Sequence, residues 1–351
     1  MRKGTIIFVF LLLGVLLFIY TLKKVGFEAV KEAVFMFSYS QLFLLLLLLA
    51  AGMVGMGTLR WRLIMKTLDV PVPKYSKLAL IKLVGYSLSY LTPAALFGGE
   101  PARFYILRTE DEKENSRLAA SIIVDKMMQT FSSAFFFFSG LVLFLIYLDL
   151  SRMIEILLLV ILVIVILLIF FLIKRVQKVS QEKGFFISAL EFLYLNKIKK
   201  IKDMHKTFRQ IEEEIRKFFH NSKKILLKTI LLTFAEVIFV LIVFWLIIFF
   251  MGHVLTIPRV LVIRSMTDLS MIIPFPASLG TLEVAQAFAF ENFSLGAATG
   301  VGLSLIFRGI SLALSFLGLI VFVFFHIKGA IDRFSRKILK LIPNNEEKNS
   351  A

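Results

Sequence analysis

The chain of 351 residues contains no cysteine and only four histidines, which excludes several kinds of chemistry. Without thiols there are no disulfides, no thiol nucleophile and no cysteine-bound zinc or iron–sulfur cluster. The histidines are scattered and lack metal-ligand spacing. A Walker loop, a G-x-G-x-x-G turn and a Ser/His/Asp set are also absent, which argues against ATP-driven transport by this chain alone. The sequence therefore predicts neither a metal site nor a cofactor.

Acidic residues are also scarce, with 24 Asp and Glu against 41 Lys and Arg, whereas 58% of the chain is hydrophobic. A soluble domain carries about 45–50% apolar residues, and the mean hydropathy here is +0.86. Runs such as 42–51, 135–148 and 156–173 have few or no charges. We therefore predict an all-α, multi-pass membrane protein. The positive charge lies in the loops, so it reports orientation rather than nucleic-acid binding.

Six segments are long enough to cross a membrane, at about 20 residues per crossing. They are 5–22, 41–59, 118–148, 153–173, 225–251 and 295–326. No small-residue cleavage site precedes the lysines after the first segment, so we expect a retained helix rather than a signal peptide. Two further apolar segments, 78–92 and 260–273, are too short. Each ends at a proline and is followed by a glycine-containing turn and a second short apolar piece.

The distribution of basic residues decides how the two short pairs are arranged. If each pair enters and leaves the membrane by one face, cytoplasmic segments hold 31 of the 41 Lys and Arg residues and outer segments hold 5. If either pair crosses instead, the basic loop 174–224 or the basic tail 327–351 moves outside. We therefore predict two re-entrant helical hairpins, or two pairs of very short spans, in a cell-membrane protein whose two termini are cytoplasmic.

Each half then has three crossings and one hairpin. Because three is an odd number, the second half begins on the opposite face of the membrane and is inverted relative to the first. The hairpins share a spacing, because Pro93 precedes Glu100 by seven residues and Pro276 precedes Glu283 by seven. The turn glycines between them are Gly98, Gly99 and Gly280. We predict an inverted repeat, whose parts are a first repeat 1–148, a second repeat 149–326 with a cytoplasmic insertion 174–224, and a basic tail 327–351.

The insertion contains apolar residues at spacings of three and four, which predicts an amphipathic helix. These residues are Ile198, Ile201, Met204, Phe208, Ile211, Ile215 and Phe218. The other face is rich in lysine, so we expect the helix to lie flat on the anionic inner leaflet or over the helix bundle.

Short paired segments broken by glycine and proline, in an inverted repeat, are typical of a secondary-transporter site. Unwound backbone is costly in lipid unless it lines a polar cavity or is covered by protein. We therefore expect the two turns to meet near the middle of the membrane. There the second helix of each hairpin presents free N–H groups and a positive dipole end, which suits a phosphate or a carboxylate.

Charged residues inside apolar segments are candidate substrate ligands, because ionisable groups at depth are costly and usually line pathways. Glu100 and Glu283 begin the second helices of the hairpins, where each either caps its helix or contacts the substrate. Asp125 and Lys126 either bind substrate or belong to an ion pair where a long helix emerges into water. Arg308 is too deep for easy snorkelling, so it requires a carboxylate or a phosphate.

The candidate carboxylate partners of Arg308 are Glu100, Glu283, Asp125 and Asp268. Arg264 and Asp268 are four residues apart, which favours a pair with each other over a ligand role. Arg103 and Arg108 follow the first hairpin, where they either attract an anionic headgroup or only set the topology.

Two further features are predicted to carry little chemistry. Glu236, in the fifth crossing, is an isolated acid with no obvious partner. Arg60, Trp61 and Arg62 have the character of an interface anchor at the inner end of the second crossing.

Three stretches around the hairpins resemble a known family: 91–108 (LTPAALFGGEPARFYILR), 121–126 (SIIVDK) and 273–283 (IPFPASLGTLE). They are similar to the transmembrane, flippase-like domain of lysylphosphatidylglycerol synthases and to stand-alone membrane proteins with that domain. The resemblance covers nearly the whole chain outside the inner loop. It implies movement of an aminoacylated or otherwise modified phospholipid between leaflets.

Longer relatives carry a soluble aminoacyl-transferase domain after the membrane part, so we expect any transferase here to be a separate protein. The leading hypothesis is a lipid translocase with a membrane phospholipid as its partner. Arg308 and the hairpin N-termini would hold phosphate, whereas Glu100, Glu283 and Asp125 would meet a cationic headgroup or exchange protons. The alternatives are an intramembrane lipid-modifying enzyme that uses the same carboxylates, and a non-catalytic membrane partner of a separate aminoacyl- or glycosyl-transferase.

Overall fold

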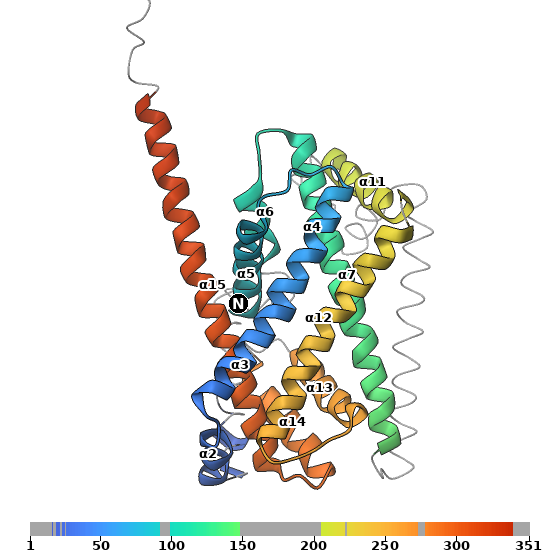
Figure 1. Ribbon diagram of the computed structural model, residues 1–351, viewed down its shortest axis with the longest axis vertical. Coiled ribbons are helices and arrows are strands. Elements are labelled where there is room, and N and C mark those ends of the chain that lie inside the picture. The colour runs from blue at the N-terminus through green and yellow to red at the C-terminus, as the bar shows by residue number, and fades with distance from the viewer. Residues whose placement is uncertain are drawn as a thin grey trace, which may run out of the picture.

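The computed structural model describes residues 26–91, 99–147, 205–221, 223–272 and 278–339, with a few positions between 16 and 24. Every regular element among them is a helix, as predicted (Figure 1). The elements are α2 (Phe27–Phe35), α3 (Tyr39–Ala50), η1 (Ala51–Met56), α4 (Gly57–Thr67), α5 (Tyr75–Leu91), α6 (Glu100–Leu107), α7 (Glu112–Tyr147), α11 (His205–Asn221), α12 (Lys223–Phe250), α13 (Ile257–Ile272), α14 (Thr281–Asn292) and α15 (Ala297–Leu339).

Four helices in the described part of the chain are long and apolar enough to cross a membrane. They are Tyr39–Thr67, which joins α3, η1 and α4, and Glu112–Tyr147, Lys223–Phe250 and Ala297–Phe325. These helices correspond to four of the six predicted crossings. Of the other two, 153–173 lies outside the described residues, and 5–22 is described at only a few positions. Large apolar side chains such as Phe131 and Phe324 are 65% and 74% exposed. Such surfaces are expected to face lipid.

The first long helix begins at a capping box and contains a π-helical turn. The Ser38 hydroxyl accepts from the Gln41 backbone N–H, and the Gln41 side chain accepts from the Ser38 N–H, so both orphan donors are satisfied. The π-helical turn, η1, shifts the helix register and contains Gly52, where a Cβ would lie 2.6 Å from the Cβ of Phe239 in α12. The close approach lets η1 pack on α12.

The two predicted short pairs are present as helices, α5 with α6 and α13 with α14, and the helices of each pair contact each other. The 17 residues of α5 extend about 25 Å at 1.5 Å per residue, which is shorter than the hydrocarbon core of about 30 Å. The pairs lie toward opposite ends of the long helices (Figure 1). The turns that join the helices of each pair, 92–98 and 273–277, lie outside the described residues.

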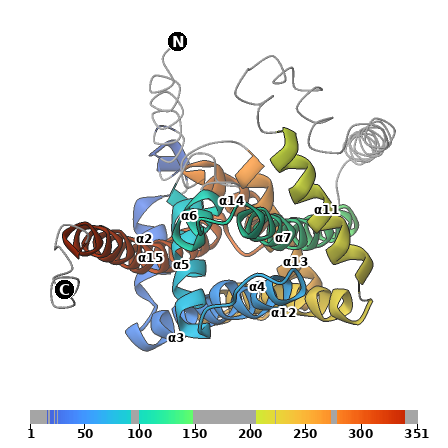
Figure 2. The same cartoon turned by 90° about the horizontal axis from the view of Figure 1, so that it is seen from above.

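Each half packs its first short helix along the last long helix of the other half. Thus α5 lies along α15, and α13 lies along α7 (Figure 2). The two contacts are alike in detail. A Cβ on Gly318 of α15 would lie 1.9 Å from the hydroxyl oxygen of Ser87, and one on Gly140 of α7 would lie 1.7 Å from that of Ser265. Small residues permit such close packing of membrane helices.

The predicted amphipathic helix is confirmed for residues 205–221, as α11, and it packs on α7. Ile211, Ile215 and Phe218 are buried in the same apolar core as α4 and α7, and the hydroxyl of Ser116 donates to the side-chain oxygen of Gln210 at 3.3 Å. Of the two expected positions, α11 has the one over the bundle. Residues 198–204, the first part of the predicted helix, lie outside the described residues.

Candidate functional site

The Asp125 carboxylate, on α7, is surrounded by three basic side chains from three other helices. Nε of Arg60 donates to its Oδ1 at 2.8 Å, and Nζ of Lys82 and Nη2 of Arg103 donate to its Oδ2 at 2.5 and 2.9 Å. Asp125 is 1% exposed, and charge-assisted bonds of this kind are the strong ones. The carboxylate therefore fastens α4, α5 and α6 to α7.

Glu236 of α12 extends this arrangement. It accepts from Nη1 of Arg60 through Oε2 and from Nε2 of Gln129 through Oε1 at 2.9 Å, so Arg60 bridges two carboxylates. The sequence offers no obvious partner for Glu236, but the structure gives it two, Arg60 and Gln129. They were not obvious because they are 176 and 107 residues away in the sequence. We call the following five residues the Asp125 cluster: Arg60, Lys82, Arg103, Asp125 and Glu236.

The interpretation of Arg60 and Trp61 as an interface anchor is wrong, since both are 0% exposed. The Trp61 ring supports the cluster, because the guanidinium carbon of Arg103 lies 3.8 Å from its centroid, a cation–π contact. The Trp61 indole N–H donates to the Ser121 hydroxyl at 3.2 Å. Arg103 itself is 3% exposed, whereas Arg108 is exposed, so of these two arginines only Arg103 enters the interior.

Glycines on α4 and α5 provide the space that the long basic side chains occupy. A Cβ on Gly57 would lie 2.8 Å from Cε of Lys82, and one on Gly85 would lie 2.7 Å from Cδ of Arg103. The predicted turn glycine Gly99 lies against the backbone of Gly85, where a Cβ would approach the Gly85 carbonyl oxygen to 1.9 Å. The close approach of α6 to α5 therefore requires glycine at both positions.

Glu100 and Lys126 form a separate ion pair, with Nζ and Oε1 3.2 Å apart. Their side chains are 18% and 17% exposed, so this pair is more open than the neighbouring cluster. Asp125 and Lys126, adjacent in sequence, thus have different partners. Both residues belong to ion pairs, as one of the two interpretations expects, and the Asp125 carboxylate is enclosed by protein.

The second half of the chain places Glu283 against Arg308. Nη1 of Arg308 lies 2.6 Å from Oε1 of Glu283 in an ion pair, and Nη2 donates to Oε2 at 3.2 Å. Glu283 also accepts from the Gly280 N–H at 2.8 Å, at a glycine with φ of 79°, so it caps α14 as well. Among its candidate partners, Arg308 therefore contacts Glu283, and it also donates to the Ser278 carbonyl at 3.1 Å.

The expected pair of Arg264 and Asp268 is confirmed, with Nη1 and Oδ1 2.5 Å apart. Next to it, the side-chain amide of Gln286 donates to the Ile263 carbonyl at 3.0 Å and to the Thr267 hydroxyl at 2.8 Å. These bonds join α14 to α13. They hold the second pair of short helices together near the Glu283–Arg308 pair.

The short helix α5 touches both groups of charges. Lys82 belongs to the Asp125 cluster, whereas Tyr90, two turns later, interacts electrostatically with Arg308 and Glu283. The Tyr90 ring also stacks on Tyr86, with centroids 6.1 Å apart. Eight residues of helix span about 12 Å, so α5 reaches from one group of charges to the other. Of the other predicted turn residues, Pro93, Gly98 and Pro276 lie outside the described residues.

Comparison with known proteins agrees with this architecture. A model of the family described as lysylphosphatidylglycerol synthase TM region matches residues 6–318. A UPF0104 membrane protein of Methanothermobacter thermautotrophicus is 33% identical over 97 residues, 28% of each chain. The UPF0104 membrane protein MJ1595 of Methanocaldococcus jannaschii is 24% identical over 288 residues, 78% of this chain and 81% of that protein. No solved structure matches the chain significantly.

Proposed function

The chain belongs to the family of the lysylphosphatidylglycerol synthase transmembrane region, and from this premise we propose that it is a lipid translocase. It moves a phospholipid, or a phospholipid with a modified headgroup, between the leaflets of a membrane without changing it chemically. The observation that carries the proposal is the presence of two buried charge groups, the Asp125 cluster and the Glu283–Arg308 pair, both of which α5 reaches. Ionisable side chains at this depth in an apolar bundle are costly and typically line a pathway.

The headgroup would pass along this route while the acyl chains stay in lipid. Arg308 and Arg103 would hold the phosphate, because a guanidinium binds two oxygens at once. Glu283 and Glu100 would meet a cationic part of the headgroup. Asp125 already accepts from three protein cations, so we assign it to holding those cations and no longer to a cationic headgroup. A headgroup that carries both a positive and a negative charge can take the place of either partner when an ion pair opens. No buried charge is then left without a partner.

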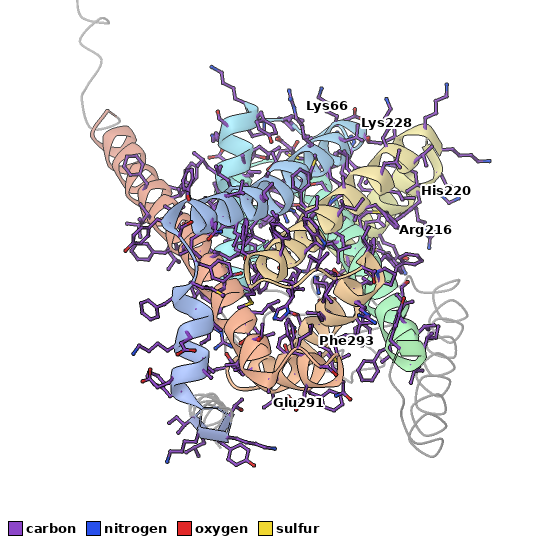
Figure 3. The ribbon with its side chains drawn as sticks, turned by 60° about the horizontal axis from the view of Figure 1, so that its bottom comes forward. Lys66, Arg216, His220, Lys228, Glu291 and Phe293 are labelled. Atoms are coloured by element: carbon purple, nitrogen blue, oxygen red, sulfur yellow. The ribbon has the colours of Figure 1, made fainter. Side chains whose placement is uncertain are left out.

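The proposed topology has six crossings and two re-entrant hairpins in an inverted repeat. The reciprocal packing of α5 on α15 and of α13 on α7 supports it, because a two-fold relation between the halves generates such an exchange. The basic side chains of Lys66, Arg216 and Lys228 gather at one end of the molecule, with Glu291 at the other (Figure 3). The positive-inside rule then favours the cytoplasm for the first end.

The test is a liposome assay with the purified full-length protein. Vesicles carry a trace of fluorescent phosphatidylglycerol, lysylphosphatidylglycerol or phosphatidylethanolamine, and a membrane-impermeant reductant bleaches the outer leaflet. Empty vesicles lose about half of the fluorescence, and we expect protein-containing vesicles to lose most of it for at least one headgroup. Mass spectrometry of the recovered lipid must show an unchanged mass. A folded protein that moves none of the three lipids, or that alters the lipid, contradicts the proposal.

A further inference from the structure

The Asp125 cluster holds more positive than negative charge. Its three cations face two carboxylates among the described residues, and all five residues are at most 6% exposed. Lys126, next to Asp125 in the sequence, and Glu100 pair with each other and so contribute no balance. A buried charge without a partner is strongly unfavourable. Among the residues that the structure describes, one negative charge is therefore missing from this part of the interior.

Two buried N–H groups border the place where that charge belongs. Nη2 of Arg60 and Nε of Arg103 have no hydrogen-bond partner among the described residues. Both guanidinium groups donate to the same carboxylate, Asp125, so their open donors lie near one another. Nε and Nη2 lie on the same edge of a guanidinium group. Arg103 donates to Asp125 through Nη2, whereas its Nε on that edge has no partner in the described part of the chain. An incoming oxyanion would use the free donors.

We propose that the Asp125 cluster is an anion site completed by one singly charged phosphate ester. A phosphodiester carries one negative charge, which equals the surplus of the cluster, and its two free oxygens match donors on two arginines. The assignment of the phosphate to a lipid headgroup rests on the proposed function; the same chemistry would also admit a free phosphate ion. The cluster would therefore recognise a headgroup by its phosphate.

A neutral Lys82 is the competing way to balance the charges. Without its proton the cluster has two arginines against two carboxylates, and no anion is required. Lys82 is the right residue to change, because among the described residues its one carboxylate partner within 4.0 Å is Asp125, which retains Arg60 and Arg103. Lys82→Met keeps the side-chain length and removes the surplus. The anion site predicts that this variant loses anion binding, whereas a neutral Lys82 predicts no change.

The experiment measures the melting temperature of the purified full-length protein in a neutral, phospholipid-free detergent. The probes are dihexanoylphosphatidylglycerol, inorganic phosphate and the uncharged dihexanoylglycerol. A ligand that binds only the folded state raises the melting temperature with its concentration. We expect a rise of a few degrees with the phosphatidylglycerol, reduced by salt, and none with the uncharged lipid. The control is Lys77→Met, the same substitution on the exposed side of α5, which should keep the full rise.

Each outcome decides the matter. Loss of the rise in a folded Lys82→Met, with the rise kept in Lys77→Met, supports the site. The absence of a rise in the unaltered protein, or an equal rise in Lys82→Met, overturns it. A rise with inorganic phosphate as large as that with the lipid overturns the assignment to a headgroup. The liposome assay is independent: translocation without a rise overturns only this inference, and a rise without translocation overturns only the proposed function.

Discussion

Arg308 and Glu283, 25 residues apart, form a buried ion pair in which Nη1 lies 2.6 Å from Oε1 and Nη2 donates to Oε2 at 3.2 Å. The corresponding spacing in the first half leads from Glu100 to Asp125, two acids that cannot pair. There Glu100 contacts Lys126, and Asp125 binds three cations instead. The two halves thus share spacing and helix packing but differ in charge, and under the proposed function they would present different chemistry to a headgroup.

The first prediction concerns the role of Arg308. Arg308→Ala leaves the fully buried Glu283 without its cation, which should lower stability by about 3–5 kcal/mol. Arg308→Lys keeps the charge but loses the two-bond fork. If Arg308 holds lipid phosphate, the lysine variant should melt near the temperature of the unaltered protein and translocate lipid poorly. Melting temperature and liposome translocation are measured together. Normal translocation by either stably folded variant would remove Arg308 from the substrate path.

Much of the fold follows from local sequence. Four crossings were predictable from long, mainly apolar segments. The short pairs were predictable from segments that end at proline and are followed by glycine. The pair of Arg264 and Asp268 was also predictable, because residues four apart share a helix face. Because Arg308 lies deep in an apolar segment, it requires an anionic partner, and four carboxylates were the candidates. These inferences use either neighbouring residues or the cost of a charge in lipid.

The Asp125 cluster was not predictable in this way, because its bonds connect distant segments. Arg60 is 65 residues from Asp125 and 176 from Glu236, and Lys82 is 43 from Asp125. The sequence does contain a signal: Lys82 is a charge inside a short apolar segment, and Glu236 is one inside a long crossing. Charged residues inside apolar segments require partners. Two such residues of opposite sign without an assigned partner therefore indicate a buried group of charges. The sequence alone does not supply the packing that identifies it.

The second prediction separates two arginines, one residue apart, that received the same interpretation from the sequence. Arg60 is completely buried and bridges Asp125 and Glu236, whereas Arg62 is half-buried. Arg60→Met should destabilise the protein by about 3–5 kcal/mol, because it leaves Glu236 without its arginine. Arg62→Met should change the melting temperature only slightly. The check is thermal unfolding of both variants in the same detergent, and equal effects would contradict the bridging role of Arg60.

The third prediction tests the packing of α5 on α15 with two glycines of one helix. At Gly318 a Cβ would lie 2.7 Å from the Leu83 carbonyl oxygen, whereas at Gly309 nothing lies within 4 Å. Gly318→Ala should therefore destabilise by about 1–3 kcal/mol through overpacking. Gly309→Ala should stabilise by about 0.5–1 kcal/mol, since alanine favours the helix. Melting temperatures that shift in the same direction for both variants would show that α15 does not approach α5 this closely.

The last prediction tests the membrane topology by cysteine labelling. Because the chain contains no cysteine, each introduced thiol is the only one in its variant. Lys74 and Glu110 flank the pair α5 and α6, whereas Val254 and Asn292 flank α13 and α14, and all four are exposed. Each is replaced by cysteine and labelled in intact cells with a membrane-impermeant maleimide. If both pairs are re-entrant, Val254→Cys and Asn292→Cys label from outside, and Lys74→Cys and Glu110→Cys label only after permeabilisation. A pair that crosses the membrane would place its two flanking cysteines on opposite faces, and such a split result at either pair would reject the inverted repeat.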